Sequence, residues 1–116
     1  MKQINVLVLG VGGNVSQGIL TAIKSSNLNC HIAGACISEE SLGLYYCDSA
    51  FISPYANDPK FVEWVADVCN NENIDIVFSG VEENVMAYTK SYEVPLHRKD
   101  KETLWIRMIQ RMKSRL

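Results

Sequence analysis

Apolar residues follow two spacings along this chain, short continuous runs and longer stretches with helical periodicity. The short runs are rich in β-branched residues, which is typical of buried strands. They predict strands at residues 4–9, 31–37, 49–52 and 75–79. Apolar positions three and four residues apart predict a helix from Val15, capped by Asn14 or Ser16, and a second helix that begins at Asp58-Pro59 and ends at Asn70-Asn71.

Strands and helices therefore alternate, which favours an α/β fold. A helical turn is expected near Leu44-Tyr45, and a further helix from Glu82 to Lys90. Crossovers of this length join parallel strands and place helices on the sheet faces. The sequence predicts a three-layer, doubly wound parallel sheet with strand order 3-2-1-4. Ligands in such sheets bind at the carboxyl ends of the strands, where the order reverses.

The last twenty residues differ from the rest of the chain. Val94–His97 has the pattern of a short edge strand, and residues 97–116 predict a basic amphipathic helix. Its apolar stripe contains Trp105, Met108, Ile109, Met112 and Leu116. This helix either packs on the sheet, binds a partner, contacts a membrane or nucleic acid, or forms a homo-oligomer. We therefore divide the chain into a domain at 1–96 and a C-terminal helix at 97–116.

Composition narrows the function classes. The chain has 116 residues, a formal net charge of -2 and 47% hydrophobic residues, as expected for one globular domain. Residues 1–96 carry four lysines against eleven acids, whereas residues 97–116 carry seven Lys/Arg against Asp100 and Glu102. The start lacks the features of a signal peptide, so we expect a cytoplasmic protein with neither nucleic acid nor membrane as partner. The four cysteines have no metal-site spacing, and no catalytic residue and no metal site is predicted.

A glycine-rich loop follows the first strand and reads Gly10-Val11-Gly12-Gly13-Asn14. Such a loop at a helix N-terminus can bind an anion through backbone N–H groups. Val15 stands where a dinucleotide fingerprint has its third glycine, and Cys36 replaces the acid expected at the end of the second strand. Three interpretations stay open, namely a dinucleotide site, a site for another phosphate or carboxylate, and a purely architectural turn.

Several ordered stretches resemble the N-terminal domain that precedes the ATP-grasp fold in carbamoyl-phosphate synthase large subunits and their relatives. They are Val6–Gly13 with Gln17-Gly18, Tyr46-Cys47-Asp48, Ile52-Ser53-Pro54, Asp58–Val62, Glu72–Val77 and Glu82-Glu83-Asn84. Asp100–Leu104 is similar to the helix that leads into the ATP-binding domains. The resemblance covers about residues 4–104 and implies a Rossmann-like domain.

The resemblance also implies a site and a partner. By position, the ligand-binding residues would be Gly10, Gly12, Gly13, Asn14, Ser79, Gly80 and Glu82. ATP and Mg²⁺ belong to the complete family enzyme, and we expect neither to be bound by this chain itself. The chain would serve as a docking domain for an ATP-grasp domain or partner chain, without catalysing ligation alone. The alternative is a stand-alone nucleotide- or dinucleotide-binding module.

Overall fold

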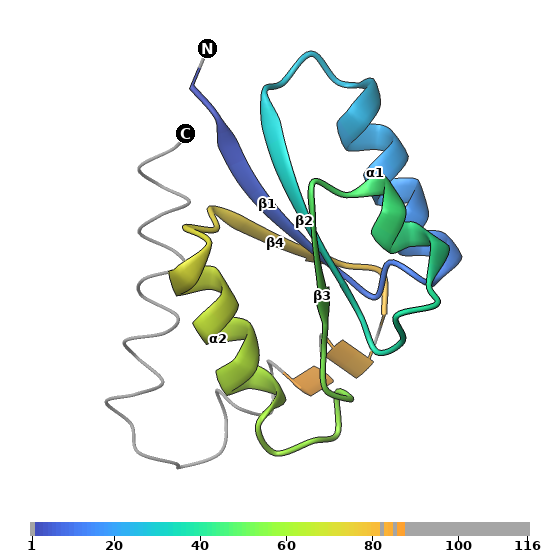
Figure 1. Ribbon diagram of the computed structural model, residues 1–116, viewed down its shortest axis with the longest axis vertical. Helices are drawn as coiled ribbons and strands as arrows, with labels where there is room; N and C mark the ends of the chain where they lie inside the picture. Colours follow the sequence, from blue (N-terminus) through green and yellow to red (C-terminus); the bar gives the residue numbers. More distant parts are fainter. Residues whose placement is uncertain (1, 82, 85, 88–116) are drawn as a thin grey trace.

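A four-stranded parallel sheet forms the centre of the protein (Figure 1). The computed structural model describes residues 2–81, 83–84 and 86–87. The strands are β1 (Ile4–Leu9), β2 (Cys30–Cys36), β3 (Ser49–Ile52) and β4 (Ile76–Ser79). They pair in the order β3-β2-β1-β4, and every pair is parallel. The predicted α/β class and the strand order 3-2-1-4 are confirmed.

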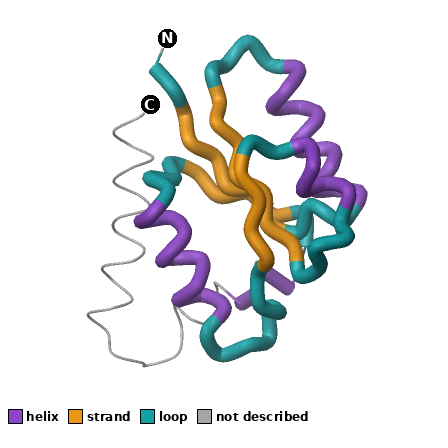
Figure 2. The backbone as a smooth tube through the Cα atoms, viewed as in Figure 1, coloured by secondary structure: helices purple, strands orange, loops and turns teal. Residues whose placement is uncertain are grey.

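Helices cover both faces of the sheet and give the predicted three layers (Figures 1 and 2). One face carries α1 (Asn14–Ser25) together with a short 3₁₀ helix, η1 (Leu42–Tyr46). The opposite face carries α2 (Phe61–Asn71). The change of face follows from the topology, because the crossovers from β1 to β2 and from β3 to β4 run in opposite directions along the sheet, and right-handed crossovers of opposite direction place their helices on opposite sides.

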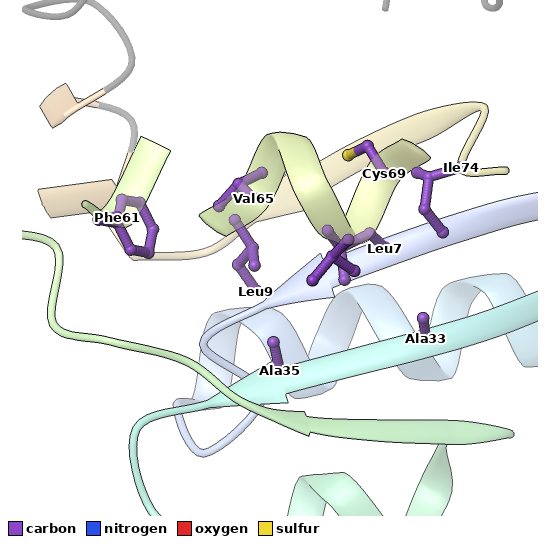
Figure 3. Packing of buried hydrophobic residues seen from close by; sticks show 9 residues of the cluster. Leu7, Leu9, Ala33, Ala35, Phe61, Val65, Cys69 and Ile74 are labelled. Carbon is purple, nitrogen blue, oxygen red and sulfur yellow. The ribbon is translucent and has the colours of Figure 1, made fainter. Parts of the chain in front are cut away.

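The two faces of β1 supply two separate cores. Leu7 and Leu9 point toward α2, where they pack with Phe61 and Val65 (Figure 3). The alternate positions of β1 point toward α1 and pack with a second set that includes Leu20. Residues 6–9 are all buried. A strand covered on both faces has no polar side, which explains why the first apolar run shows no alternation.

The N-terminal caps of both main helices differ from the predicted ones. Gly13 is the N-cap of α1, and neither Asn14 nor Ser16 provides a side-chain cap. The helix α2 begins at Phe61, because Asp58 forms a turn before it. The carboxylate of Asp58 accepts the N–H of Lys60 at 2.8 Å, and its carbonyl accepts the N–H of Phe61 at 3.0 Å. The predicted start at Asp58-Pro59 is therefore too early.

The bounds of two strands differ slightly from the predicted ones, and some predicted elements lie outside the described residues. β2 begins at Cys30 and ends at Cys36, one residue earlier at each end than predicted, and β4 begins at Ile76. Glu83, Asn84, Met86 and Ala87 are helical, in agreement with the helix expected after β4. Glu82, the edge strand at 94–97 and the helix at 97–116 lie outside the described residues. Within the described part of the chain, no helix is long and apolar enough to cross a membrane.

Candidate ligand site at the carboxyl edge of the sheet

The predicted site residues come together because β1 and β4 are neighbours. Leu9 at the end of β1 is the register partner of Ser79 at the end of β4. The loop at 10–13 and the loop that begins at Gly80 therefore leave the sheet side by side. Five of the seven predicted residues lie on these two loops or at the start of α1, Ser79 is the last residue of β4, and Glu82 lies outside the described residues.

Ser16 joins the two loops. Its side chain is buried and donates a hydrogen bond to the carbonyl of Leu9 at 2.7 Å. The same hydroxyl accepts the N–H of Gly80 at 2.9 Å. A serine in the first turn of a helix usually suggests a cap, so its role between strands could not be read from the spacing. Ser16 is the site residue that sequence reasoning missed.

The close approach of the two loops requires glycine at two positions. Gly10 has a φ of 69°, and a Cβ there would collide with the side chain of Val81. A Cβ on Gly80 would lie 2.6 Å from the backbone nitrogen of Ser16. The structure thus leaves no room for side chains where the two loops meet. Both glycines have an architectural role at the point where the strand order reverses.

Most N–H groups of the glycine loop are already bonded within the protein. Those of Gly10 and Val11 donate to the carbonyl of Ala35, at 2.8 and 3.2 Å. The N–H of Gly13 donates to the carbonyl of Gly10 at 3.0 Å. The first two bonds hold the loop against the end of β2 and the third closes a turn within the loop, so these three groups face protein acceptors.

The first turn of α1 offers different donors. The first intrahelical bond runs from the N–H of Gln17 to the carbonyl of Gly13, so the preceding helical N–H groups have no partner within the helix. Asn14 and Val15 at this end are exposed. The helix dipole adds a partial positive charge there, which favours an anion. Of the loop residues predicted to bind a ligand, Asn14 has the geometry that suits one best.

The side chain of Cys36 lies at the end of β2, between Ser41 and Gly12. Its sulfur is 2.9 Å from the hydroxyl of Ser41 and would be 3.0 Å from a Cβ on Gly12. Burial alone raises the pKa of the Cys36 thiol, but hydrogen bonds from Ser41 and from the N–H groups of Ser38, Gly12 and Ile37 lower it, and the net shift is downward. Dinucleotide-binding folds keep an acid for the ribose at this position. Here a thiol that is hydrogen-bonded to Ser41 stands in its place.

The hydroxyl of Ser79 is also engaged. It donates to the carbonyl of Val81 at 3.2 Å and accepts the N–H of the same residue at 3.1 Å. The side-chain amide of Asn84, which is buried, donates to it at 3.1 Å. Ser79 and Asn84 therefore hold the start of the segment after β4. Whether any of the seven predicted residues binds a ligand stays a prediction.

An exposed apolar rim surrounds this edge of the sheet. It consists of Val15 at the start of α1, Ile37 directly after β2, Ile52 at the end of β3, and Tyr55. All four side chains are exposed. Exposed apolar residues at the ends of neighbouring elements suit a surface that another protein or domain covers. The rim is the second feature of the site that the sequence pattern did not reveal.

Comparison with known proteins agrees with this fold. Residues 6–95 match the sequence profile described as the PylC-like, N-terminal domain. Among curated proteins, none matches the chain. The matched range contains β1 from Val6 onward, the other three strands, both main helices and the glycine loop. The chain therefore belongs to the PylC-like N-terminal domain family, the domain that precedes the ATP-grasp fold in ATP-grasp ligases.

Proposed function

We propose that this chain is the N-terminal domain of a carbamoyl-phosphate synthase-like ATP-grasp ligase and docks against the ATP-grasp part through the carboxyl edge of its sheet. The apolar rim of Val15, Ile37, Ile52 and Tyr55 is the observation that carries this proposal. These four side chains come from separate segments, yet they surround the end of the sheet where ligands bind in this fold class. A flat domain surface would then bury them in the complete enzyme.

The same edge would also form a surface that binds an anionic group of the substrate. Its donors are the N–H groups at the first turn of α1, beside Asn14, while Gly10, Gly12, Gly13, Ser79 and Gly80 shape the surface. Glu82 is retained as a ligand-binding residue from the sequence alone. ATP and Mg²⁺ would be bound by the ATP-grasp part, so we expect no ligase activity from this domain by itself.

The alternative, a stand-alone dinucleotide-binding module, has less support. The N–H groups of Gly10, Val11 and Gly13 donate to protein atoms, so they do not offer the open pyrophosphate cradle of such modules. Cys36 occupies the position of the ribose-binding acid, and its sulfur is hydrogen-bonded to the hydroxyl of Ser41. Two independent features thus disfavour a dinucleotide at this edge.

Two measurements separate these functions. Gel filtration of the purified chain mixed with the ATP-grasp part of a PylC-like ligase from the same source should show co-elution. Thermal shift with NAD(P), ATP and AMP tests the alternative, because a ligand at 100 times its Kd stabilises a protein by about 2.7 kcal/mol. We expect co-elution and an unchanged melting temperature. Separate elution together with a clear shift for one nucleotide would contradict the proposal.

A further inference from the structure

The 3₁₀ helix η1 packs on the glycine loop and exposes apolar side chains that are not part of the carboxyl-edge rim. Leu42, Tyr45 and Tyr46 are 71%, 77% and 60% exposed, and we call these three residues the η1 surface. Gly43 between them is buried, and a Cβ there would collide with the carbonyl of Val11. The backbone of η1 is therefore pressed against the glycine loop, which fixes the three side chains in an outward direction.

Charges of both signs flank the η1 surface. Glu40 lies before it and Asp48 after it, and both are exposed. Lys24 of α1 lies over the ring of Tyr46, with Nζ 5.3 Å from the ring centroid. The residues of η1 itself carry no charge. The result is an aromatic centre with a cation on the α1 side and acids at the two ends of η1.

We propose that the η1 surface is a twofold interface between two copies of this chain. In an isologous dimer the same patch meets itself, so the patch must be complementary to its own rotated image. An aromatic centre flanked by both charges meets this condition, because Lys24 of one copy can pair with Glu40 or Asp48 of the other. Exposed tyrosines are also typical of the residues that dominate binding at interfaces.

The surface of α2 lacks such an aromatic centre. Its exposed acids Glu63 and Asp67 lie one turn apart, and the exposed Lys60 is the N-cap of the helix. None of the large hydrophobic side chains of α2 is exposed, so two copies that met through α2 would bury little apolar surface. Among the described helical surfaces, η1 with the neighbouring part of α1 is therefore better suited to self-association.

Sedimentation equilibrium of the full chain over a range of concentrations tests this proposal. We expect a reversible dimer, and Tyr45→Ser or Tyr46→Ser should raise its Kd on the order of tenfold or more. Lys24→Glu should weaken the dimer as well. The charge-exchanged variant Lys24→Glu/Glu40→Lys should recover affinity relative to Lys24→Glu, because each copy again offers both signs.

Matched controls use exposed residues elsewhere. Leu28→Ser removes an apolar side chain that is 58% exposed outside the η1 surface, and Asp67→Lys reverses an acid on α2. Both should leave the Kd unchanged. A chain that stays monomeric at every concentration would overturn the proposal. A dimer that is insensitive to both tyrosine variants would also overturn it. If Ile109→Ser abolished such a dimer, the contact would be assigned to residues 97–116.

Discussion

The hydroxyl of Ser16 ties the carbonyl of Leu9 to the N–H of Gly80, across 2.7 and 2.9 Å. One side chain at the start of α1 thereby links the end of β1 to the segment that leaves β4. The two strands lie next to each other in the sheet but are far apart in the sequence. Ser16 therefore fixes the relative position of the two loops on which the candidate site is built.

Replacing Ser16 with alanine should destabilise the domain. The substitution removes both hydrogen bonds and leaves the N–H of Gly80 without its acceptor, which costs about 1–3 kcal/mol for a buried donor. Urea denaturation followed by circular dichroism measures the change. Ser25→Ala in the same helix is the control, since Ser25 is exposed, and we expect it to stay within about 0.5 kcal/mol of the parent. Equal stability of the two variants would be inconsistent with the linking role of Ser16.

Substitutions at two glycines should have opposite signs. A Cβ at Gly12 would lie 2.8 Å from the hydroxyl of Ser41 and 3.0 Å from the sulfur of Cys36, so Gly12→Val should lower the free energy of unfolding by about 1–3 kcal/mol. At Gly18 no atom lies within 4 Å of the added Cβ. Gly18→Ala should stabilise α1 by roughly 0.5–1 kcal/mol. Urea midpoints of the two variants provide the comparison, and a stabilising Gly12→Val would refute the packing described around Cys36.

The thiol of Cys36 should titrate at lower pH than the half-buried thiols of Cys30 and Cys47. Burial raises the pKa of Cys30 and of Cys47, whereas hydrogen bonds outweigh burial at Cys36 and lower its pKa below 9.0. Thiolate absorbance at 240 nm, recorded as the difference between the parent chain and Cys36→Ser, isolates this group. Ser41→Ala removes one donor and should move the titration upward. A Cys36 titration above that of Cys30 would contradict the hydrogen-bonded arrangement.

The same shift predicts a pH dependence of stability. Between the folded pKa of Cys36 and 9.0, the unfolded chain holds more protons at this position than the folded chain. The contribution of Cys36 to the free energy of unfolding therefore rises with pH through this window, and it is lost as pH falls through the folded pKa. Urea titrations of the parent and of Cys36→Ser at several alkaline pH values should diverge in this direction. Parallel curves across the window would exclude the predicted linkage.

The order of the strands could be predicted from the sequence because each apolar run is short and each connection is long enough for a crossover. The starts of the helices could not. At α2, Asp58-Pro59 has the propensity to begin a helix. Asp58 instead forms a turn in which its carboxylate accepts the N–H of Lys60. At α1, the N-cap is Gly13, and the side chain of Ser16 donates a hydrogen bond to the carbonyl of Leu9 instead of capping the helix.

The candidate site was predictable in position and less so in chemistry. The spacing of Gly10 to Asn14 located the edge of the sheet, but the partners of the loop N–H groups depend on contacts between distant residues. Ala35 comes from β2, and Gly80 follows β4. The apolar rim could not be predicted, because Ile37 and Ile52 end apolar runs and the sequence does not show that their side chains are exposed. Only the fold brings Val15 and Tyr55 to one edge.

Isothermal titration calorimetry is the most direct test of the docking role that we propose for the carboxyl edge. The ATP-grasp part of a PylC-like ligase from the same source would be titrated into the parent chain, into Ile37→Ser/Tyr55→Ser and into the control Leu28→Ser. We predict saturable one-to-one binding by the parent and the control, with affinity reduced on the order of tenfold or more in the rim variant. Equal affinity of all three chains, or no heat of binding for the parent, would contradict the proposed docking face.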